Sequence, residues 1–211
     1  MALIEAETTA ACRIGGLTAG VVAGLGLAYA AVLWLGLSSL TNPGDPIGDP
    51  WFTTMEVLIL LMAPLLPLLW AAIHLQAPPR ARVLTLGALM FVSLTAALTS
   101  GVHILVLTLA RGAGRATPDW LAFRWPSAVY AVDLLAWDVF FGLAALLAGF
   151  AFGRAGLDGV IRILLFASGS LSIAGLLGPM TGVMDLRLIG VVGYAVVFPV
   201  AAGLIAIRFR R

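Results

Sequence analysis

Residues 83–110 read VLTLGALMFVSLTAALTSGVHILVLTLA and contain no aspartate, glutamate, lysine or arginine. At a rise of about 1.5 Å per residue, a helix over this stretch exceeds the roughly 30 Å hydrocarbon core of a bilayer. The stretch also lacks the charged face that a helix on the surface of a soluble protein carries. It therefore predicts a membrane-spanning helix, with lipid as the solvent of the chain.

Five other apolar runs have the same character, and short polar segments separate them. We expect six spanning helices, at residues 14–38, 54–76, 83–110, 126–152, 159–179 and 187–207. The segments between them are rich in proline, glycine or arginine, as in NPGDPIGDP at 42–50. The pattern predicts an all-α, polytopic integral membrane protein whose residues 1–211 form one six-helix bundle.

The composition agrees with this prediction and indicates an orientation. The chain is 62% hydrophobic and only 10% charged, whereas a soluble domain has about 25% charged residues. All 12 basic residues are arginine. One side of the predicted topology carries Arg13, Arg80, Arg82, Arg154, Arg162, Arg208, Arg210 and Arg211, and the other carries Arg111, Arg115, Arg124 and Arg187. The positive-inside rule then places both termini on the cytoplasmic side of the membrane. We expect that membrane to be a bacterial-type inner or plasma membrane.

The same pattern bears on partners and cofactors. Loop arginines of a membrane protein face lipid headgroups, so we expect the lipid bilayer and no nucleic acid as a partner. The single Cys12 excludes an internal disulfide. The chain has no lysine for a retinal Schiff base, and His74 and His103 are predicted at opposite depths, too far apart to ligate one haem. We therefore expect no cofactor.

Polar groups recur at one depth of the predicted bundle. His103 and Asp133 each lie about 10 Å from the outer end of their spans. The same outer half holds Glu56, Tyr29, Tyr130, Tyr194, Asp185 and Arg187. An ionised side chain exposed to lipid at mid-depth costs about 2.5–3.5 kcal/mol. These groups are therefore predicted to face the interior of the bundle.

Helical spacing supports that prediction on two spans. Tyr130, Asp133 and Trp137 fall on one stripe of the fourth span, and Thr99 and His103 fall on one stripe of the third. In the second span, prolines at 64 and 67 are expected to kink the helix and widen the bundle on its outer side.

These residues define a predicted pocket in the outer half. The candidate catalytic residues are Asp133, His103 and Glu56, and the candidate ligand-binding residues are Tyr130, Trp137, Asp138, Thr99 and Trp125. A carboxyl group that keeps its proton can act as a general acid, and an ionised one can act as a base. One nitrogen and two carboxylates could also ligate a metal ion, but an imidazole hydrogen-bonded between helices is the simpler interpretation, so we expect no metal.

Asp138 is predicted to be a separate feature. On a regular helix it lies about 140° around the axis from Asp133 and about 18 Å from the outer end. The two carboxylates are then unable to point at one site, and Asp138 needs a partner on another helix or a proton of its own.

Three functions are compatible with this pattern. The leading hypothesis is that the pocket binds a small lipophilic molecule, with conversion of that molecule by acid–base chemistry left open. The first alternative is a transporter that uses Asp133 and Asp138 as successive proton or cation stations. The second is a non-catalytic subunit or assembly factor that packs through the glycine face of the first span, at Gly16, Gly20 and Gly24. We expect this face to pack within the chain, with an oligomer as the alternative.

Overall fold

The computed structural model describes residues 2–42, 45–110 and 117–211. The described residues form helices and no strand. Six helical segments are long and apolar enough to cross a membrane: Ala11–Ser38, Trp51–Gln76, Pro79–Leu109, Ala128–Ala151, Gly156–Thr181 and Met184–Phe209. The predicted six-helix membrane bundle is therefore confirmed, with span ends that differ from the predicted ones by a few residues.

Several spans consist of more than one helical element. The first three spans are α1 (Ala2–Ser38), then α2 (Trp51–Met62) with α3 (Leu65–Gln76), then η1 (Pro79–Ala81), α4 (Arg82–Leu105) and η2 (Val106–Ala110). The fourth is α5 (Ala128–Leu134), η3 (Leu135–Phe141), α6 (Gly142–Ala148) and η4 (Gly149–Ala151). The last two are α7 (Gly156–Ala174) with α8 (Leu177–Thr181), then η5 (Met184–Arg187), α9 (Leu188–Val192), η6 (Gly193–Val197) and α10 (Phe198–Phe209). Among these, η2, η3 and η6 are π-helical.

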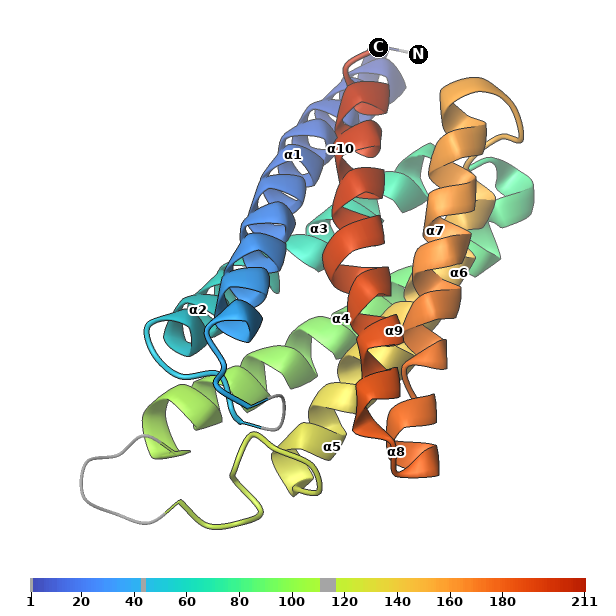
Figure 1. Ribbon diagram of the computed structural model, residues 1–211. Coiled ribbons are helices and arrows are strands. Elements are labelled where there is room, and N and C mark those ends of the chain that lie inside the picture. Colours follow the sequence, from blue (N-terminus) through green and yellow to red (C-terminus); the bar gives the residue numbers. More distant parts are fainter. Residues whose placement is uncertain (1, 43–44, 111–116) are drawn as a thin grey trace.

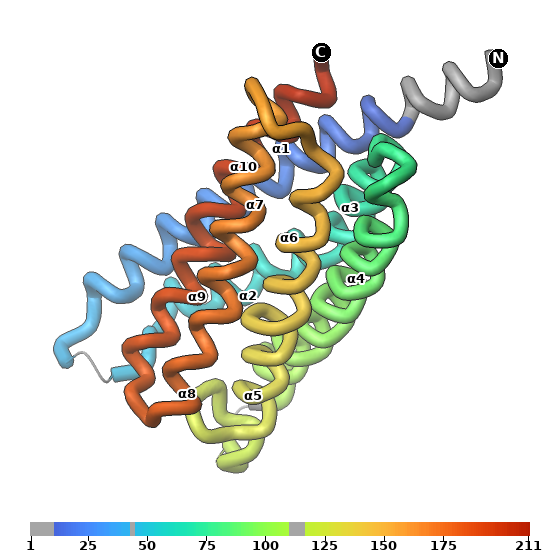
Figure 2. The backbone as a smooth tube through the Cα atoms, turned by 90° about the vertical axis from the view of Figure 1, so that its right-hand side faces the viewer, coloured from blue at the N-terminus to red at the C-terminus, as the bar shows by residue number. Residues whose placement is uncertain are grey.

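The spans follow one another around a closed ring. Each span packs against the next in the chain, and α1 packs along α10 to close the ring. Figure 1 shows α1 and α10 side by side, and the tube in Figure 2 follows the same path from a perpendicular direction. Both termini lie at one end, here called the terminal end. The loops after α1 and before α5 lie at the opposite, distal end.

Proline breaks the second span as predicted. Between α2 and α3, the carbonyl of Ala63 accepts from Leu66 N at 3.3 Å. Pro64 and Pro67 have no amide N–H to continue the regular ladder. The break lies on the side of the ring where the cavity described below is found, so it is placed to widen the bundle there.

Large apolar side chains cover the outside of the ring. Val83, Met90 and Ile163 are 83%, 65% and 67% exposed, although each lies within a span. A soluble protein rarely presents such continuous apolar faces to water. Together with the six apolar helices, this surface makes the chain a multi-pass membrane protein.

The glycine face of α1 packs largely within the chain. A Cβ atom on Gly16 would lie 3.4 Å from Phe209 Cβ, and one on Gly20 would lie 3.9 Å from Ala206 Cβ, both on α10. A Cβ on Gly24 would meet nothing within 4 Å in the described part of the chain. Two of the three glycines thus let α1 approach α10, as expected for helix packing in lipid.

The terminal half of the ring has a core of aromatic and aliphatic side chains. The rings of Trp70, Phe141 and Phe198 pack at centroid distances of 5.0–6.1 Å. The indole nitrogen of Trp70 donates to the carbonyl oxygen of Ala144 at 3.2 Å, so its polar group is satisfied. Closer to the terminal end than these rings, five further side chains are almost fully buried: Ile73, Ala148, Ile161, Leu165 and Ile205. This packing lies between the polar residues of the distal half and the terminal end.

Candidate functional site

A cavity of about 260 Å³ lies between the spans in the distal half. Its described lining comes from the first, second, third, fourth and sixth spans and the loops after α1 and before α5. Most of the lining is apolar, with Leu33, Met55, Ile59, Met62 and Val191 among its side chains. Three lining residues, Leu37, Pro46 and Leu188, are exposed, so the cavity reaches the surface beside α1 and α9.

One wall of this cavity is ionic. Nδ1 of His103 on α4 lies 2.7 Å from Oε2 of Glu56 on α2. Nε2 of the same ring lies 3.5 Å from Oδ1 of Asp133 on α5. All three side chains are 5% exposed or less. An imidazole offers N–H donors on both nitrogens when it is protonated, so His103 is placed to bridge two carboxylates from different spans.

Arg187, at the end of η5, extends the ionic wall to the sixth span. Its Nη2 donates to Oδ2 of Asp133 at 2.9 Å, and its Nε lies 3.8 Å from Oδ2 of Asp138. The guanidinium also lies over the ring of Tyr130, 4.7 Å from its centroid. Glu56, His103, Asp133, Arg187 and Asp138 thus form one chain of contacts, here called the ionic network.

The expectation that Asp133 and Asp138 face different sites is wrong. Asp138 lies in η3, where the backbone is π-helical. The π-helix is bonded from residue i to i+5 and not to i+4, so it has more residues per turn and residues five apart lie closer in angle than on an α-helix. Both carboxylates therefore reach the same guanidinium of Arg187. A regular α-helix would have kept them apart.

Local contacts stabilise the irregular fourth span. Ser127 caps the start of α5, because its side-chain oxygen accepts from the backbone N–H of Tyr130 at 3.2 Å. Within η3, the carbonyl of Ala136 accepts from the hydroxyl of Thr95 at 3.1 Å. The indole nitrogen of Trp137 donates to the hydroxyl of Thr99 at 3.0 Å. The predicted polar stripe of α4 therefore faces inward and holds the fourth span in register.

Glycines on the neighbouring spans make room for Asp138. A Cβ atom on Gly190 would lie 2.6 Å from Oδ1 of Asp138, and one on Gly175 would lie 3.0 Å from the same oxygen. Asp138 itself is fully buried. The close crossing of α7 and α9 thus depends on these two glycines, and larger residues there would push the carboxylate out of its position.

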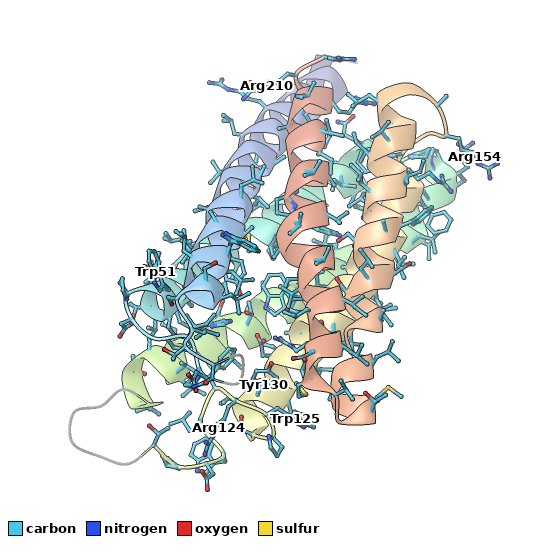
Figure 3. All side chains as sticks on the ribbon, viewed as in Figure 1. Trp51, Arg124, Trp125, Tyr130, Arg154 and Arg210 are labelled. Carbon is cyan, nitrogen blue, oxygen red and sulfur yellow. The ribbon has the colours of Figure 1, made fainter. Side chains whose placement is uncertain are left out.

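The structure brings together five of the predicted site residues at the cavity. Glu56, His103, Asp133, Tyr130 and Trp137 all line it. Figure 3 shows Tyr130 at the distal end with Trp125 and Arg124, far from Arg154 and Arg210 at the terminal end.

The other three predicted ligand-binding residues lie outside the lining. Trp125 is 38% exposed, with its ring 6.4 Å from that of Tyr130, and Phe123 lines the cavity in its place. Thr99 holds the indole of Trp137. Asp138 lies 3.8 Å from Arg187 and is not among the lining residues. For these residues the geometry indicates supporting positions, which differs from the direct ligand contacts that were predicted.

Sequence reasoning did not assign three of the lining residues that carry polar groups to the site. Arg187 was noted at the start of the sixth span, but its pairing with the fourth span has no local sequence pattern. Tyr29 and Tyr194 were noted in the same layer, and both line the cavity. The sequence did contain one indication for these two tyrosines, because each lies on a further span at the predicted depth of Asp133.

Two other features bear on earlier expectations. Among the described residues, no group of three histidine, cysteine, aspartate or glutamate side chains has an arrangement that could hold a metal ion. Of the arginines used to predict orientation, Arg111 and Arg115 lie outside the described residues.

Comparison with protein families, with curated proteins and with solved structures finds no match to this chain. The residues of the chain itself are therefore the basis for a functional proposal.

Proposed function

We propose that the protein binds a small lipophilic molecule in the distal cavity, with the polar group of that molecule against the ionic network. The observation that carries this proposal is a cavity with apolar walls on most sides and buried charged groups on one side. Pockets for small molecules combine largely apolar linings with a few convergent polar groups in this way. Exposed lining residues beside α1 and α9 supply a route from the lipid.

The same wall has groups that can move a proton to or from a bound molecule. Oδ1 of Asp133 and Nε2 of His103 lie 3.5 Å apart at the cavity, and neither atom has a hydrogen-bond partner among the described residues. A carboxylate and an imidazole within reach of one substrate atom suit general acid–base catalysis. Conversion of the ligand would therefore use Asp133 as acid or base, with His103 and Glu56 as its partners.

A matched pair of cavity variants tests the binding proposal. Val191 lines the cavity, whereas its neighbour Val192 is 45% exposed on the outside of α9. We expect an alkyl diazirine probe with an octyl chain to label α2 and α9 of the wild type after photolysis, as mapped by mass spectrometry. Val191→Phe should reduce this labelling several-fold, because the larger ring fills the cavity, and Val192→Phe should leave it unchanged. Equal labelling of both variants would contradict the proposal.

Transport through Asp133 and Asp138 remains the second candidate. The shared contact with Arg187 favours it, because the two carboxylates are linked as successive stations would be. On the terminal side of Asp138, however, Phe141, Phe198 and Leu165 are fully buried apolar residues. These three residues give a proton or cation no polar partner, although the hydroxyl groups of Ser168 and Ser172 on α7 are also buried. Binding therefore receives more support than transport. A pH-dependent flux in vesicles that Asp138→Asn abolishes would reverse this ranking.

The role of a non-catalytic subunit stays a third prediction. Gly16 and Gly20 already approach α10 of the same chain, which leaves Gly24 as the open position on that face. A stable complex in mild detergent that Gly24→Leu abolishes would support it.

The proposed orientation places the cavity in the outer leaflet. Arg154 and Arg210 lie at the terminal end (Figure 3), and Arg13 lines a surface hollow together with Arg210. The positive-inside rule puts such an arginine-rich end in the cytoplasm. The setting we propose is an inner or plasma membrane of bacterial type.

A further inference from the structure

The charge balance of the ionic network bears on the kind of molecule that the cavity accepts. The network contains three carboxyl groups, those of Glu56, Asp133 and Asp138, and two basic side chains, those of His103 and Arg187. Even with His103 protonated, the ionised network has an excess negative charge. An uncompensated charge is costly in the membrane interior. The excess is therefore neutralised by a proton on a carboxyl group or by a cation in the cavity.

Each basic group of the network has carboxylates beside it. Arg187 donates to Asp133, lies 3.8 Å from Asp138 and covers one face of the Tyr130 ring. His103 lies between Glu56 and Asp133. His103 Nε2 and Arg187 Nε make no hydrogen bond among the described residues, but each lies within 3.8 Å of a carboxylate oxygen. An anionic ligand at either nitrogen would therefore be repelled by that carboxylate, whereas a cation would be attracted by it.

One carboxylate oxygen at the cavity has no donor. Asp133 lines the cavity and is 4% exposed, and its Oδ1 has no hydrogen-bond partner in the described part of the chain. The nearest donor atom recorded for it is His103 Nε2, at 3.5 Å. This buried oxygen supplies the negative charge that a cationic group in the cavity would face.

The aromatic lining adds a second, independent attraction for a cation. Six aromatic side chains contribute to the wall: Tyr29, Phe52, Phe123, Tyr130, Trp137 and Tyr194. Ring faces attract ammonium groups through their quadrupole, and aromatic cages recognise quaternary ammonium ligands in this way. The guanidinium of Arg187 over Tyr130 shows that one of these rings already makes such a contact.

We infer that the ligand of the distal cavity is a lipophilic cation, namely an organic ammonium group on an apolar tail. The cationic head lies between Oδ1 of Asp133 and the aromatic rings. The tail packs against apolar lining residues such as Ile59, Met62 and Val191. This inference rests on the proposed function, since it names the class of molecule that the same cavity binds.

Three probes with one tail and different heads test this inference. The full chain is placed in nanodiscs of phosphatidylcholine, which has no net charge, and titrated with octyltrimethylammonium, octanol or octanoate while tryptophan fluorescence is recorded. Trp137 lines the cavity and reports occupancy. We expect octyltrimethylammonium to bind about tenfold more tightly than octanol, as cation–π attraction and one buried carboxylate together allow. Octanoate should bind more weakly than octanol.

Variants separate binding in the cavity from partition into the bilayer. Val191→Phe should abolish the saturable signal, and Val192→Phe should preserve it. Asp133→Asn removes the excess negative charge and should reduce the preference for octyltrimethylammonium over octanol to less than about threefold. Glu56→Gln removes the same charge without breaking the contact to Arg187, so it provides a second test if Asp133→Asn does not fold.

The outcomes distinguish the two proposals. If no probe gives a signal that Val191→Phe abolishes, both the proposed function and this inference are overturned. If octanol or octanoate binds in the cavity as tightly as octyltrimethylammonium, the binding site stands and the cationic preference is overturned.

Discussion

The distal and terminal halves of the bundle use the same six spans but are packed on different principles. In the distal half, charged side chains from four spans meet at the edge of a cavity of about 260 Å³. In the terminal half, the rings of Trp70, Phe141 and Phe198 pack against one another and are accompanied by buried aliphatic residues. Buried ion pairs connect the spans in the distal half, and apolar packing is the main contact between them in the terminal half.

This difference shows how a membrane protein accommodates a buried polar site. Between tightly packed helices in lipid, attraction comes from dispersion and from hydrogen bonds, because apolar side chains gain little by leaving lipid for protein. A cavity forfeits part of the dispersion, so the helices around it need other contacts. The ionic network supplies those contacts, and the irregular η3 segment positions Asp138 for it.

Removal of Arg187 should have the largest effect on stability. Arg187→Met leaves the carboxylate of Asp138 without a counter-ion and that of Asp133 with His103 alone. Breaking a buried ion pair from one side costs about 3–5 kcal/mol in the free energy of unfolding. Titration with a denaturing detergent in mixed micelles, followed by tryptophan fluorescence, measures this free energy.

A double variant provides the control for this prediction. Arg187→Met combined with Asp138→Asn removes one positive and one negative group, so it should be more stable than Arg187→Met alone. If the two changes add, the destabilisation comes from lost packing of the arginine side chain and not from unpaired charge.

A core truncation in the terminal half should have the next largest effect. Ile161 on α7 is fully buried, and Ile163, two residues later, is 67% exposed. Ile161→Ala should lower the free energy of unfolding by about 2–5 kcal/mol, because it opens a void in packed surroundings. Ile163→Ala should change it by less than about 0.5 kcal/mol. Similar losses for the two variants would mean that the terminal half is not tightly packed around α7.

The ion pair of the terminal half should have the smallest effect. Nε of Arg208 lies 2.8 Å from Oδ1 of Asp158, and the two side chains are 41% and 30% exposed. Arg208→Gln should lower the free energy of unfolding by less than about 1 kcal/mol, and the loss should shrink as salt is added. A loss as large as that of Arg187→Met, at the same salt concentration, would remove the contrast between the two halves.

The fold could be predicted from the sequence because its main constraint is local. A run such as 83–110 has to cross the membrane whatever its neighbours are, and proline and glycine segments mark the turns. The proline break near residue 64 was foreseen for the same reason. The closed ring was not predicted, because the contact of α1 with α10 joins the two ends of the chain.

The candidate site was predicted in part. Depth and helical stripe brought Glu56, His103 and Asp133 to one layer, where the structure places them in contact. Both criteria assume regular helices, and they separated Asp138 from Asp133. They also gave no reason to pair Arg187 with the fourth span.

The sequence by itself determined the number of spans, their apolar exteriors and the layer in which the polar groups lie. These properties follow from the cost of placing charges and unpaired backbone groups in lipid, which each segment meets on its own. Tertiary structure alone decided that Asp133 and Asp138 share Arg187 and that the ring leaves a cavity beside them. Those features depend on π-helical backbone in η3 and on glycines at 175 and 190 that let distant spans approach, and such contacts have no expression in the local pattern of the chain.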